Sequence, residues 1–385
     1  MRKEQSTPRG GLLFLARSLN YGGSERQLVA LARGLAQRGG SLAVVTFYSG
    51  GEFRRDLEKE GIPVFCLYKS GRWDVFRFIW NFSQLIHNHK PEILCSYLGT
   101  SNLMSLVGKL ILPRVRVVWS IRASNMDLAH YGWFHVFLYR LERIFSRFSD
   151  LIIVNSYAGF NYAITKGFPR NKMVVIPNGV DTIRFSPTPF LREKIRTEWK
   201  VSDQHCLIGL IGRLDPMKDH DTFLRAAVLI WRDHQDARFV CIGDGEPSYR
   251  MKLQELGSEL GLNDCLIWSG FRSDIGAVYN ALDIACSSSA FGEGFSNAIS
   301  EAMACGVPCI VTDVGDSACI VGKTGEVVST KDPEAFAAGL KKLRMRVANN
   351  PSLGLEARQR IEQKFSVDLL VNKSSEIIFK GPPKF

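Results

Sequence analysis

Short apolar runs alternate with amphipathic segments from the start of the chain. Residues 11–16 and 42–47 are apolar almost throughout, which predicts two buried strands. The segment between them begins with Ser24 and Gln27 at the spacing of a helix capping box. It continues with apolar residues on one helical face, which are Leu28, Leu31, Ala32 and Leu35. We therefore expect a strand, a helix and a second strand in succession.

The same alternation continues to residue 176. Further strands are predicted at residues 63–67, 92–96, 115–120, 150–154 and 174–176, and helices at 73–89, 101–110 and 133–149. Nearly continuous apolar strands that alternate with helices indicate a parallel sheet covered by helices on both faces. The first half of the chain is thus predicted to be an open α/β domain, with its ligand crevice at the carboxyl ends of the strands.

A turn cluster at residues 177–181 and two nearby prolines indicate a domain boundary, which we place after Arg184. Beyond it the pattern restarts, with strands predicted at residues 206–211, 238–242, 266–269, 284–287 and 307–312 and helices at 219–232, 247–260, 277–281 and 297–305. The sequence therefore predicts two α/β domains, residues 1–184 and 185–365, that face each other across a cleft. Residues 366–385 read as a helix and a basic tail, which we expect to pack back on the first domain.

The composition excludes several classes of protein. Of the 385 residues, 45% are hydrophobic and 23% charged, which is typical of a globular protein. The nine cysteines contain no CxxC pair, which argues against a zinc ribbon or a disulfide scaffold and suggests a reducing compartment. Since no run reaches the ~20 apolar residues of a membrane span, we expect a cytoplasmic protein.

Charge is distributed unevenly between the two predicted domains. Residues 1–184 contain 25 Lys and Arg against 12 Asp and Glu, whereas the remaining residues contain 24 against 26. A basic first half beside a nearly neutral second half suggests that the first half meets an anionic partner. A membrane surface, a phosphorylated acceptor and a nucleic acid all fit this charge.

Two loops that join a strand to a helix are candidate anion sites. Gly22 and Gly23 precede the first helix, where free N–H groups can receive a phosphate, although an ordinary flexible loop fits them equally well. Arg213 and Lys218 follow the strand at 206–211, and two cations there suit a diphosphate better than they suit a plain surface loop. Asp219 and Asp221 are interpreted as helix caps rather than as a metal site, and no metal is predicted.

The most informative stretch runs from residue 291 to residue 308. Glu293 lies in a loop bounded by glycines, and Glu301 follows on the next helix with seven residues between them. The first turn of that helix presents backbone amides. A carboxylate, a row of amides and a second carboxylate are suited to sugar hydroxyls, a phosphate and ribose hydroxyls in that order. For one carboxylate alone, a solvated helix face would be the better interpretation.

This stretch resembles the E-x7-E signature of the retaining GT-B glycosyltransferases of family 4, the glycogen-synthase-like group. Further segments occur in the order and spacing of that family, and with Gly22 and Gly23 they cover nearly the whole chain. They are Ile176-Pro177-Asn178-Gly179-Val180-Asp181, Gly212-Arg213-Leu214 with Lys218, Gly243-Asp244-Gly245 and Ser269-Gly270-Phe271. The resemblance implies the GT-B fold.

The resemblance also implies roles for individual residues. Arg213 and Lys218 would bind the donor diphosphate, Glu293 would hold the hydroxyls of the donor sugar, and Glu301 would bind the ribose. The other residues implied at the donor are Gly22, Gly23, Gly212, Gly294, Phe295, Ser296 and Asn297, with Phe271 beside the base. Many family members carry a histidine where this chain has Arg122, which is expected to contact the donor phosphate or the acceptor.

The implied reaction is transfer of a sugar from a nucleoside-diphosphate sugar to a hydroxyl of a glycan or lipid-linked acceptor. Attack from the front face would retain the anomeric configuration, with no metal or other cofactor. The first domain would bind the acceptor and touch an anionic inner-membrane surface through its arginines. We expect most aromatic residues of 69–89 and 131–148 to pack inward.

Two other functions remain open at this point. A sugar-nucleotide epimerase or hydrolase would keep the fold but change the chemistry, and the complete E-x7-E stretch argues against it. A basic nucleic-acid-binding protein would explain the charge. That alternative lacks the RNP, helix-turn-helix and zinc patterns of such proteins, and no nucleic-acid partner is expected.

Overall fold

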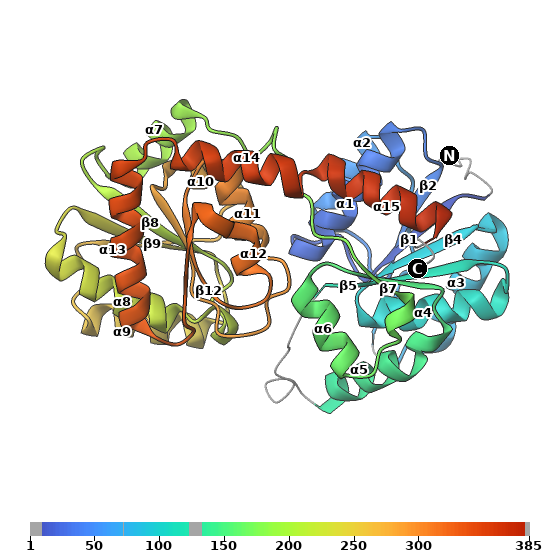
Figure 1. The fold of residues 1–385 in the computed structure, drawn as a ribbon. Helices are drawn as coiled ribbons and strands as arrows, with labels where there is room; N and C mark the ends of the chain where they lie inside the picture. The colour runs from blue at the N-terminus through green and yellow to red at the C-terminus, as the bar shows by residue number, and fades with distance from the viewer. Residues whose placement is uncertain (1–9, 72, 123–132, 382–385) are drawn as a thin grey trace. The chain divides into compact units, whose positions relative to one another are not determined.

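The structure is a computed structural model that describes residues 10–71, 73–122 and 133–381. It forms two compact units, the first comprising Met1–Gly179 with Val367–Phe385 and the second Val180–Ser366 (Figure 1). The boundary lies earlier than the one predicted after Arg184. Val180 pairs with Ser366 in a parallel bridge, and its N–H donates to the carbonyl of Phe365 at 2.8 Å, so the chain enters the second unit there.

The first unit contains a seven-stranded parallel sheet in the order β3-β2-β1-β4-β5-β6-β7. Its strands are β1 (Leu12–Ala16), β2 (Leu42–Thr46), β3 (Val64–Cys66), β4 (Ile93–Tyr97), β5 (Arg116–Ile121), β6 (Leu151–Val154) and β7 (Met173–Val175). Its helices are α1 (Gly23–Gln37), α2 (Phe53–Lys59), α3 (Val75–His89), α4 (Gly99–Ile111), α5 (Trp133–Phe145), α6 (Tyr157–Thr165) and α15 (Val367–Lys380). This is the doubly wound α/β architecture that the sequence predicts.

Helices cover both faces of this sheet. One hydrophobic core lies under α1, α2 and α15, and the other under α3 to α6. The C-terminal helix α15 packs directly on α1, and a Cβ on Gly34 would come within 2.4 Å of the Cγ2 atom of Val371. The glycine on α1 therefore permits the close approach of the two helices.

The start of α1 differs from the prediction. The helix begins at Gly23, Gly22 is its N-cap, and no side chain caps it. Gln27 is instead buried, and its side-chain amide donates to the carbonyl of Gly179 at 2.9 Å and accepts from its N–H at 2.8 Å. The predicted capping box of Ser24 and Gln27 is therefore wrong, because Gln27 binds a distant turn instead.

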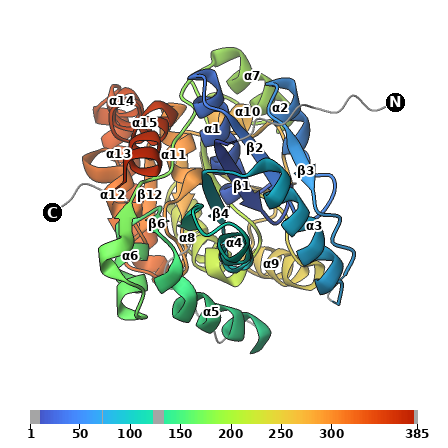
Figure 2. The ribbon, with the colours of Figure 1, turned by 90° about the vertical axis from the view of Figure 1, so that its right-hand side faces the viewer.

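The aromatic residues of α3 and α5 also differ from the prediction. Phe78 and Phe82 pack on the sheet, but Trp73 and Phe76 are 89% and 91% exposed. Other exposed aromatic residues of this layer are Trp80, Trp133, Phe137, Phe145 and Phe148. The expectation that most of them pack inward is wrong. Helix α4 contacts both α3 and α5 (Figure 2), and these aromatic side chains are exposed on the layer that the three helices form.

The second unit repeats the architecture with a six-stranded parallel sheet in the order β10-β9-β8-β11-β12-β13. Its strands are β8 (Cys206–Ile211), β9 (Ala237–Ile242), β10 (Leu266–Gly270), β11 (Ile284–Ser287), β12 (Cys309–Thr312) and β13 (Glu326–Val328). Its helices are α7 (Pro189–Glu198), α8 (His220–Asp233), α9 (Pro247–Glu259), α10 (Ile275–Ala281), α11 (Asn297–Ala304), α12 (Ser317–Val321), α13 (Pro333–Asn349) and α14 (Leu353–Phe365). Two cores again lie on opposite faces of the sheet.

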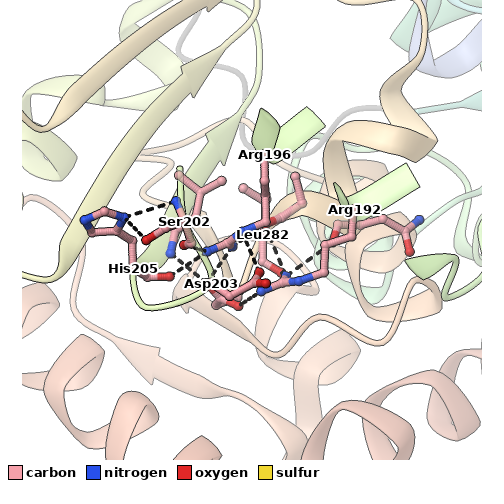
Figure 3. Close-up of polar contacts among 10 residues, drawn as sticks. Arg192, Arg196, Ser202, Asp203, His205 and Leu282 are labelled. Atoms are coloured by element: carbon pink, nitrogen blue, oxygen red, sulfur yellow. Dashed lines mark hydrogen bonds and ion pairs between the residues drawn. The ribbon is translucent and has the colours of Figure 1, made fainter. Parts of the chain in front are cut away.

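A buried arginine fastens α7 to the rest of this unit (Figure 3). The guanidinium of Arg196 donates to the carbonyls of Ser202, His205 and Ala281 at 2.6, 2.7 and 3.0 Å. It also donates to the carboxylate of Asp283 at 3.1 Å, which Arg192 reaches from the preceding turn of the helix at 2.7 Å. Both terminal nitrogens of the Arg196 guanidinium are therefore hydrogen-bonded at this junction, whereas its buried Nε atom forms no hydrogen bond with any described residue and lies 3.6 Å from the carboxylate of Asp203.

Replacement of Arg196 should destabilise the second unit. In Arg196→Met the side chain still fills the space, but Asp283 and three carbonyls lose a buried donor. We expect the free energy of unfolding to fall by about 3 kcal/mol, measured by urea denaturation followed by circular dichroism. The control is Arg232→Met on the exposed surface of α8. Equal stability of the two variants would contradict a structural role for the Arg196 contacts.

Candidate functional site

The loop after β8 is held in a defined conformation. Asp215 caps the short 3-10 helix Pro216–Lys218 and accepts a hydrogen bond from the N–H of Met217 at 2.9 Å. Arg213 lies at the surface and forms an ion pair with Asp215 at 2.9 Å. The guanidinium of Arg213 therefore faces solvent beside a loop that is itself ordered.

Lys218 and Glu293 form a largely buried ion pair. The Nζ atom of Lys218 donates to the Oε1 atom of Glu293, which also accepts from the Oγ atom of Ser289 at 2.9 Å. Burial alone would raise the pKa of the Glu293 carboxyl. The charge and hydrogen bond of Lys218, with the Ser289 hydroxyl, outweigh burial and hold that pKa below its usual value. Glu293 is therefore ionised at neutral pH.

Close backbone packing fixes both partners of this pair. The stem of Lys218 lies against Gly212, where a Cβ would come within 3.3 Å of its carbons. The hydroxyl of Ser288 donates to the carbonyl of Lys218 at 2.9 Å. Gly315 has φ +63° and approaches the carbonyl of Glu293 so closely that a Cβ there would lie 2.4 Å from its oxygen. Glycine is therefore required at position 315 on grounds of both backbone conformation and space.

Helix α11 begins immediately after this loop. Ser296 is its N-cap and Asn297 its first residue, so the amides of its first turn point back toward the loop of Glu293. Phe295 is buried and packs edge-on against Phe365 with ring centroids 5.2 Å apart. The carbonyl of Gly294 accepts from the N–H of Asp316 at 2.9 Å. The helix start is therefore anchored on both sides.

Glu301 lies on α11 and is only 4% exposed. Its Oε2 atom accepts a hydrogen bond from the hydroxyl of Tyr279 at 3.0 Å, which orients the carboxyl group. Phe271 follows Gly270 at the end of β10 and is 60% exposed. The structure thus places the predicted residues of the second unit on the loops that follow β8, β10 and β11 and on helix α11.

The two aspartates after Lys218 have structural roles. Asp219 caps α8 and accepts from the hydroxyl of Thr222 at 2.7 Å, whereas Asp221 forms an ion pair with Arg225 one turn along. Asp219 is therefore the cap, and the prediction that Asp221 also caps is wrong. Over residues 10–71, 73–122 and 133–381, no group of three or more His, Cys, Asp or Glu side chains is arranged to hold a metal ion.

In the first unit, Arg122 is held at the carboxyl end of β5 by three hydrogen bonds. Its guanidinium donates to Ser120 Oγ at 2.7 Å, to Asn178 Oδ1 at 2.7 Å and to Tyr97 Oη at 3.0 Å. It also lies over the ring of Tyr97, 4.7 Å from the centroid. Residues 123–125, which follow Arg122 in the sequence, lie outside the described residues. Gly22 and Gly23 lie at the start of α1, the predicted position.

Sequence reasoning missed two residues that support this site. Ser289 hydrogen-bonds Glu293, and a hydroxyl four positions before the carboxylate was a weak signal for that contact. Tyr279 orients Glu301 from α10, and nothing in the sequence pattern connects the two residues.

The fold defines a two-domain α/β protein whose candidate site lies on the loops after β8 and β11 and on α11. The sequence model of the family described as "Glycosyltransferase Family 4" matches residues 21–184, and that of "Glycosyl transferases group 1" matches residues 205–345. Together the two ranges span most of the chain. The protein belongs to these glycosyltransferases, and its fold is GT-B.

Individual relatives agree with this assignment. The chain is 27% identical to the GDP-mannose-dependent alpha-(1-6)-phosphatidylinositol monomannoside mannosyltransferase of Mycobacterium tuberculosis, over 70% of this chain and 72% of that protein. It is 30% identical to the UDP-Gal:alpha-D-GlcNAc-diphosphoundecaprenol alpha-1,3-galactosyltransferase of Escherichia coli, over 54% of each. The crystal structure of Anabaena Alr3699/HepE in complex with UDP and glucose superposes with a TM-score of 0.84 at 22% identity, covering 95% of this chain and 98% of that one.

Removal of the lysine should leave a buried carboxylate without its partner. In Lys218→Met we expect the free energy of unfolding at pH 7.5 to fall by about 3 kcal/mol, and Glu293→Gln in the same chain should restore much of it. In the single variant, burial without a cation raises the folded-state pKa of Glu293 above its unfolded value. The loss of folding stability is therefore absent at low pH and appears as the pH rises through the folded-state pKa of Glu293.

The corresponding measurement is Tm against pH for the single variant, the double variant and the wild type. The difference in Tm between the single and the double variant should be large at pH 7.5 and small at about pH 4.5. A difference independent of pH would show that Glu293 does not carry the charge assigned to it.

Proposed function

We propose that the protein is a retaining glycosyltransferase that uses a nucleoside-diphosphate sugar as donor. The observation that carries this proposal is the buried pair of Lys218 and Glu293 beside the start of α11. A fixed cation, a fixed carboxylate and the first-turn backbone amides of α11 belong to one system of loops. These groups match the diphosphate and sugar hydroxyls of such a donor.

The leaving nucleoside diphosphate gains negative charge as the bond to the sugar breaks. Lys218 and the first-turn amides of α11 are fixed before the reaction, so they stabilise this charge without reorganisation. Arg213 adds a second, solvent-facing guanidinium in the same loop. Two protein cations supply the charge that a metal supplies in other transferases, so the reaction is expected to proceed without one.

Glu293 is suited to binding rather than to nucleophilic attack. Its Oε1 atom already accepts hydrogen bonds from Lys218 and Ser289, and its lowered pKa makes it a weak base. Such a carboxylate holds the hydroxyls of the donor sugar. With no carboxylate acting as nucleophile, attack by the acceptor hydroxyl on the face that the diphosphate leaves would retain the anomeric configuration.

Glu301 is proposed to bind the ribose hydroxyls. Tyr279 fixes its Oε2 atom, so the carboxyl presents a constant orientation to a ligand. Phe271 provides an exposed aromatic surface for the base. The family resemblance implies that Gly22, Gly23 and Arg122 of the first unit contact the donor or the acceptor, and these roles are part of the same proposal.

The acceptor is proposed to be a glycan or a lipid-linked sugar in glycolipid or polysaccharide biosynthesis. The relatives described above are a phosphatidylinositol monomannoside mannosyltransferase and a diphosphoundecaprenol-sugar galactosyltransferase. The first unit contains 27 Lys and Arg against 13 Asp and Glu, and the second 22 against 25. A basic first unit fits an acceptor that carries phosphate.

We also propose that the outer surface of α3, α4 and α5 contacts an anionic membrane surface. This surface carries the exposed aromatic residues named above together with Leu110 and with basic residues that include Arg77, Arg140, Arg143 and Arg147. Aromatic side chains enter the interfacial layer and arginines attract anionic headgroups. Across the described residues, the helices are all too short or too polar to cross a membrane.

Donor binding is tested by thermal shift with UDP-, GDP-, ADP- and dTDP-sugars, with and without EDTA. One nucleotide family should raise the Tm by roughly 5 °C at a concentration about 100 times its Kd, with no effect of EDTA. Glu301→Ala should weaken that binding by about 2 kcal/mol, because a charged hydrogen bond to the ligand is lost. Glu255→Ala, on the exposed surface of α9, is the matched control.

Absence of any shift at millimolar ligand would overturn the donor proposal. A shift that EDTA abolishes would overturn its metal independence. If the nucleotide binds but only free sugar or an epimer accumulates, the hydrolase or epimerase alternative would replace transfer.

Membrane contact is tested by co-sedimentation with vesicles of phosphatidylcholine, alone or with phosphatidylglycerol. The wild type should bind the anionic vesicles, and added salt should weaken binding. The double variant Phe76→Ala, Trp80→Ala should bind them several-fold less. Phe190→Ala, an exposed aromatic of the second unit, is the control. Equal sedimentation of all three proteins would remove α3 from the proposed surface.

A further inference from the structure

Three consecutive serines lie at the carboxyl end of β11, and their hydroxyl groups bind different partners. Ser287, Ser288 and Ser289 are 8%, 1% and 1% exposed, so all three hydroxyls need partners within the unit. The hydroxyl of Ser288 donates to main-chain oxygens only, among them the carbonyl of Lys218 at 2.9 Å. The hydroxyls of Ser287 and Ser289 instead form a chain that ends on the side chain of Glu293.

The order of donors in this chain follows from the number of hydrogens. Ser289 donates its single hydroxyl hydrogen to the Oε1 atom of Glu293 at 2.9 Å. The Oγ atoms of Ser287 and Ser289 lie 3.3 Å apart, and Ser287 is the donor in this pair because the hydrogen of Ser289 is already used. Thr312 holds the main chain of the same segment by donating to the carbonyl of Ser289 at 2.7 Å. The direction of the Ser289 hydroxyl is therefore fixed by both its side chain and its main chain.

The two carboxylate oxygens of Glu293 consequently differ. Oε1 accepts hydrogen bonds from both Lys218 and Ser289. Oε2 receives no hydrogen bond among the described residues, yet it is not sealed from solvent. A lysine ammonium is a point charge that either oxygen of a carboxylate satisfies, whereas a hydroxyl has one donor in one direction. Ser289 is therefore the group that decides which oxygen remains open to a ligand.

We propose that Ser289, supported by Ser287, is a positioning residue that makes Glu293 present Oε2 alone to the donor sugar. This inference rests on the proposed donor site and adds to it the origin of the selectivity for the sugar. A carboxylate oxygen held in one direction accepts from one arrangement of hydroxyls, and an epimer that lacks this arrangement leaves the oxygen unpaired. A carboxylate that rotates accepts several arrangements. Ser289 thus determines how strictly the site distinguishes epimers of the donor sugar.

The test is isothermal titration calorimetry of the full chain. The probes are UDP, GDP, ADP and dTDP, each free and as its glucose, galactose, mannose, N-acetylglucosamine and N-acetylgalactosamine derivative. In the wild type, one sugar should bind about tenfold or more tightly than its epimer, because its hydroxyls pair with a charged oxygen. Ser289→Ala should reduce this ratio to about threefold or less and leave the Kd of the free nucleoside diphosphate within about twofold. Ser287→Ala should change the ratio in the same direction and by less.

Ser288→Ala is the matched control. It removes a buried hydroxyl from the neighbouring residue, but that hydroxyl binds main chain and not the carboxylate. It should lower the Tm and leave the epimer ratio at the wild-type value. Ser289→Cys, which fills the same space with a weak donor, replaces the alanine variant if that variant does not fold, and the same loss of the ratio is expected.

Free nucleotide and nucleotide sugar together separate this inference from the donor proposal. A lost epimer ratio with intact nucleotide binding in Ser289→Ala, and an unchanged ratio in Ser288→Ala, supports the inference and shows that both variants are folded. An equal ratio in the wild type and Ser289→Ala overturns it, as does an equal loss in Ser288→Ala. Parallel weakening of free nucleotide and nucleotide sugar in Ser289→Ala also overturns it, since the residue would then be structural. Nucleotide binding without any epimer ratio in the wild type overturns the inference alone, whereas no nucleotide binding at all overturns the donor proposal and the inference with it.

Discussion

The buried ion pair of Lys218 and Glu293 is the interaction on which the functional site depends. It joins the loop after β8 to the loop after β11, two neighbouring strands of one sheet. A carboxylate in this position without its lysine would either take up a proton or destabilise the unit. Because each charge is needed to keep the other buried, the loop geometry and the charge state of the site are set together.

That pair also determines what the surrounding residues can do. Its lysine is fixed by contact with Gly212, and its carboxylate by Ser289 and the approach of Gly315, so neither group has to reorganise when a ligand enters. A preorganised site of this kind stabilises developing charge more effectively than mobile side chains do. The proposed roles of Arg213 and Glu301 depend on this ion pair. Arg213 lies in the same loop as Lys218, and Glu301 lies on the helix that follows the loop of Glu293.

Much of the fold could be predicted from the sequence, because buried parallel strands are continuous apolar runs. Residues 206–211 and 284–287 are predicted with the bounds that the structure has. The periodicity does not predict helix α13. Asp332 and Pro333 provide its N-cap and its first residue, but the helix is amphipathic over only part of its length. The orientation of α3 could not be predicted, because apolar residues occupy both of its faces and periodicity alone does not select one.

The residues of the candidate site could be named from motifs, but their contacts could not. Lys218 and Glu293 are 75 positions apart, and only the strand order brings their loops together. The same limit applies to Gln27, whose partner is a turn at Gly179. Long-range pairing of this kind depends on topology, which local sequence does not encode.

The central claim is that a nucleoside diphosphate binds with its phosphates at Lys218 and Arg213. The most direct test is phosphorus NMR of UDP and of GDP with the wild type and with the double variant Arg213→Ala, Lys218→Met. In the wild type, the β-phosphorus resonance of one nucleotide should shift and broaden more than the α-phosphorus resonance, and the double variant should lose this effect. Equal perturbation in both proteins, or none in the wild type, would contradict the account.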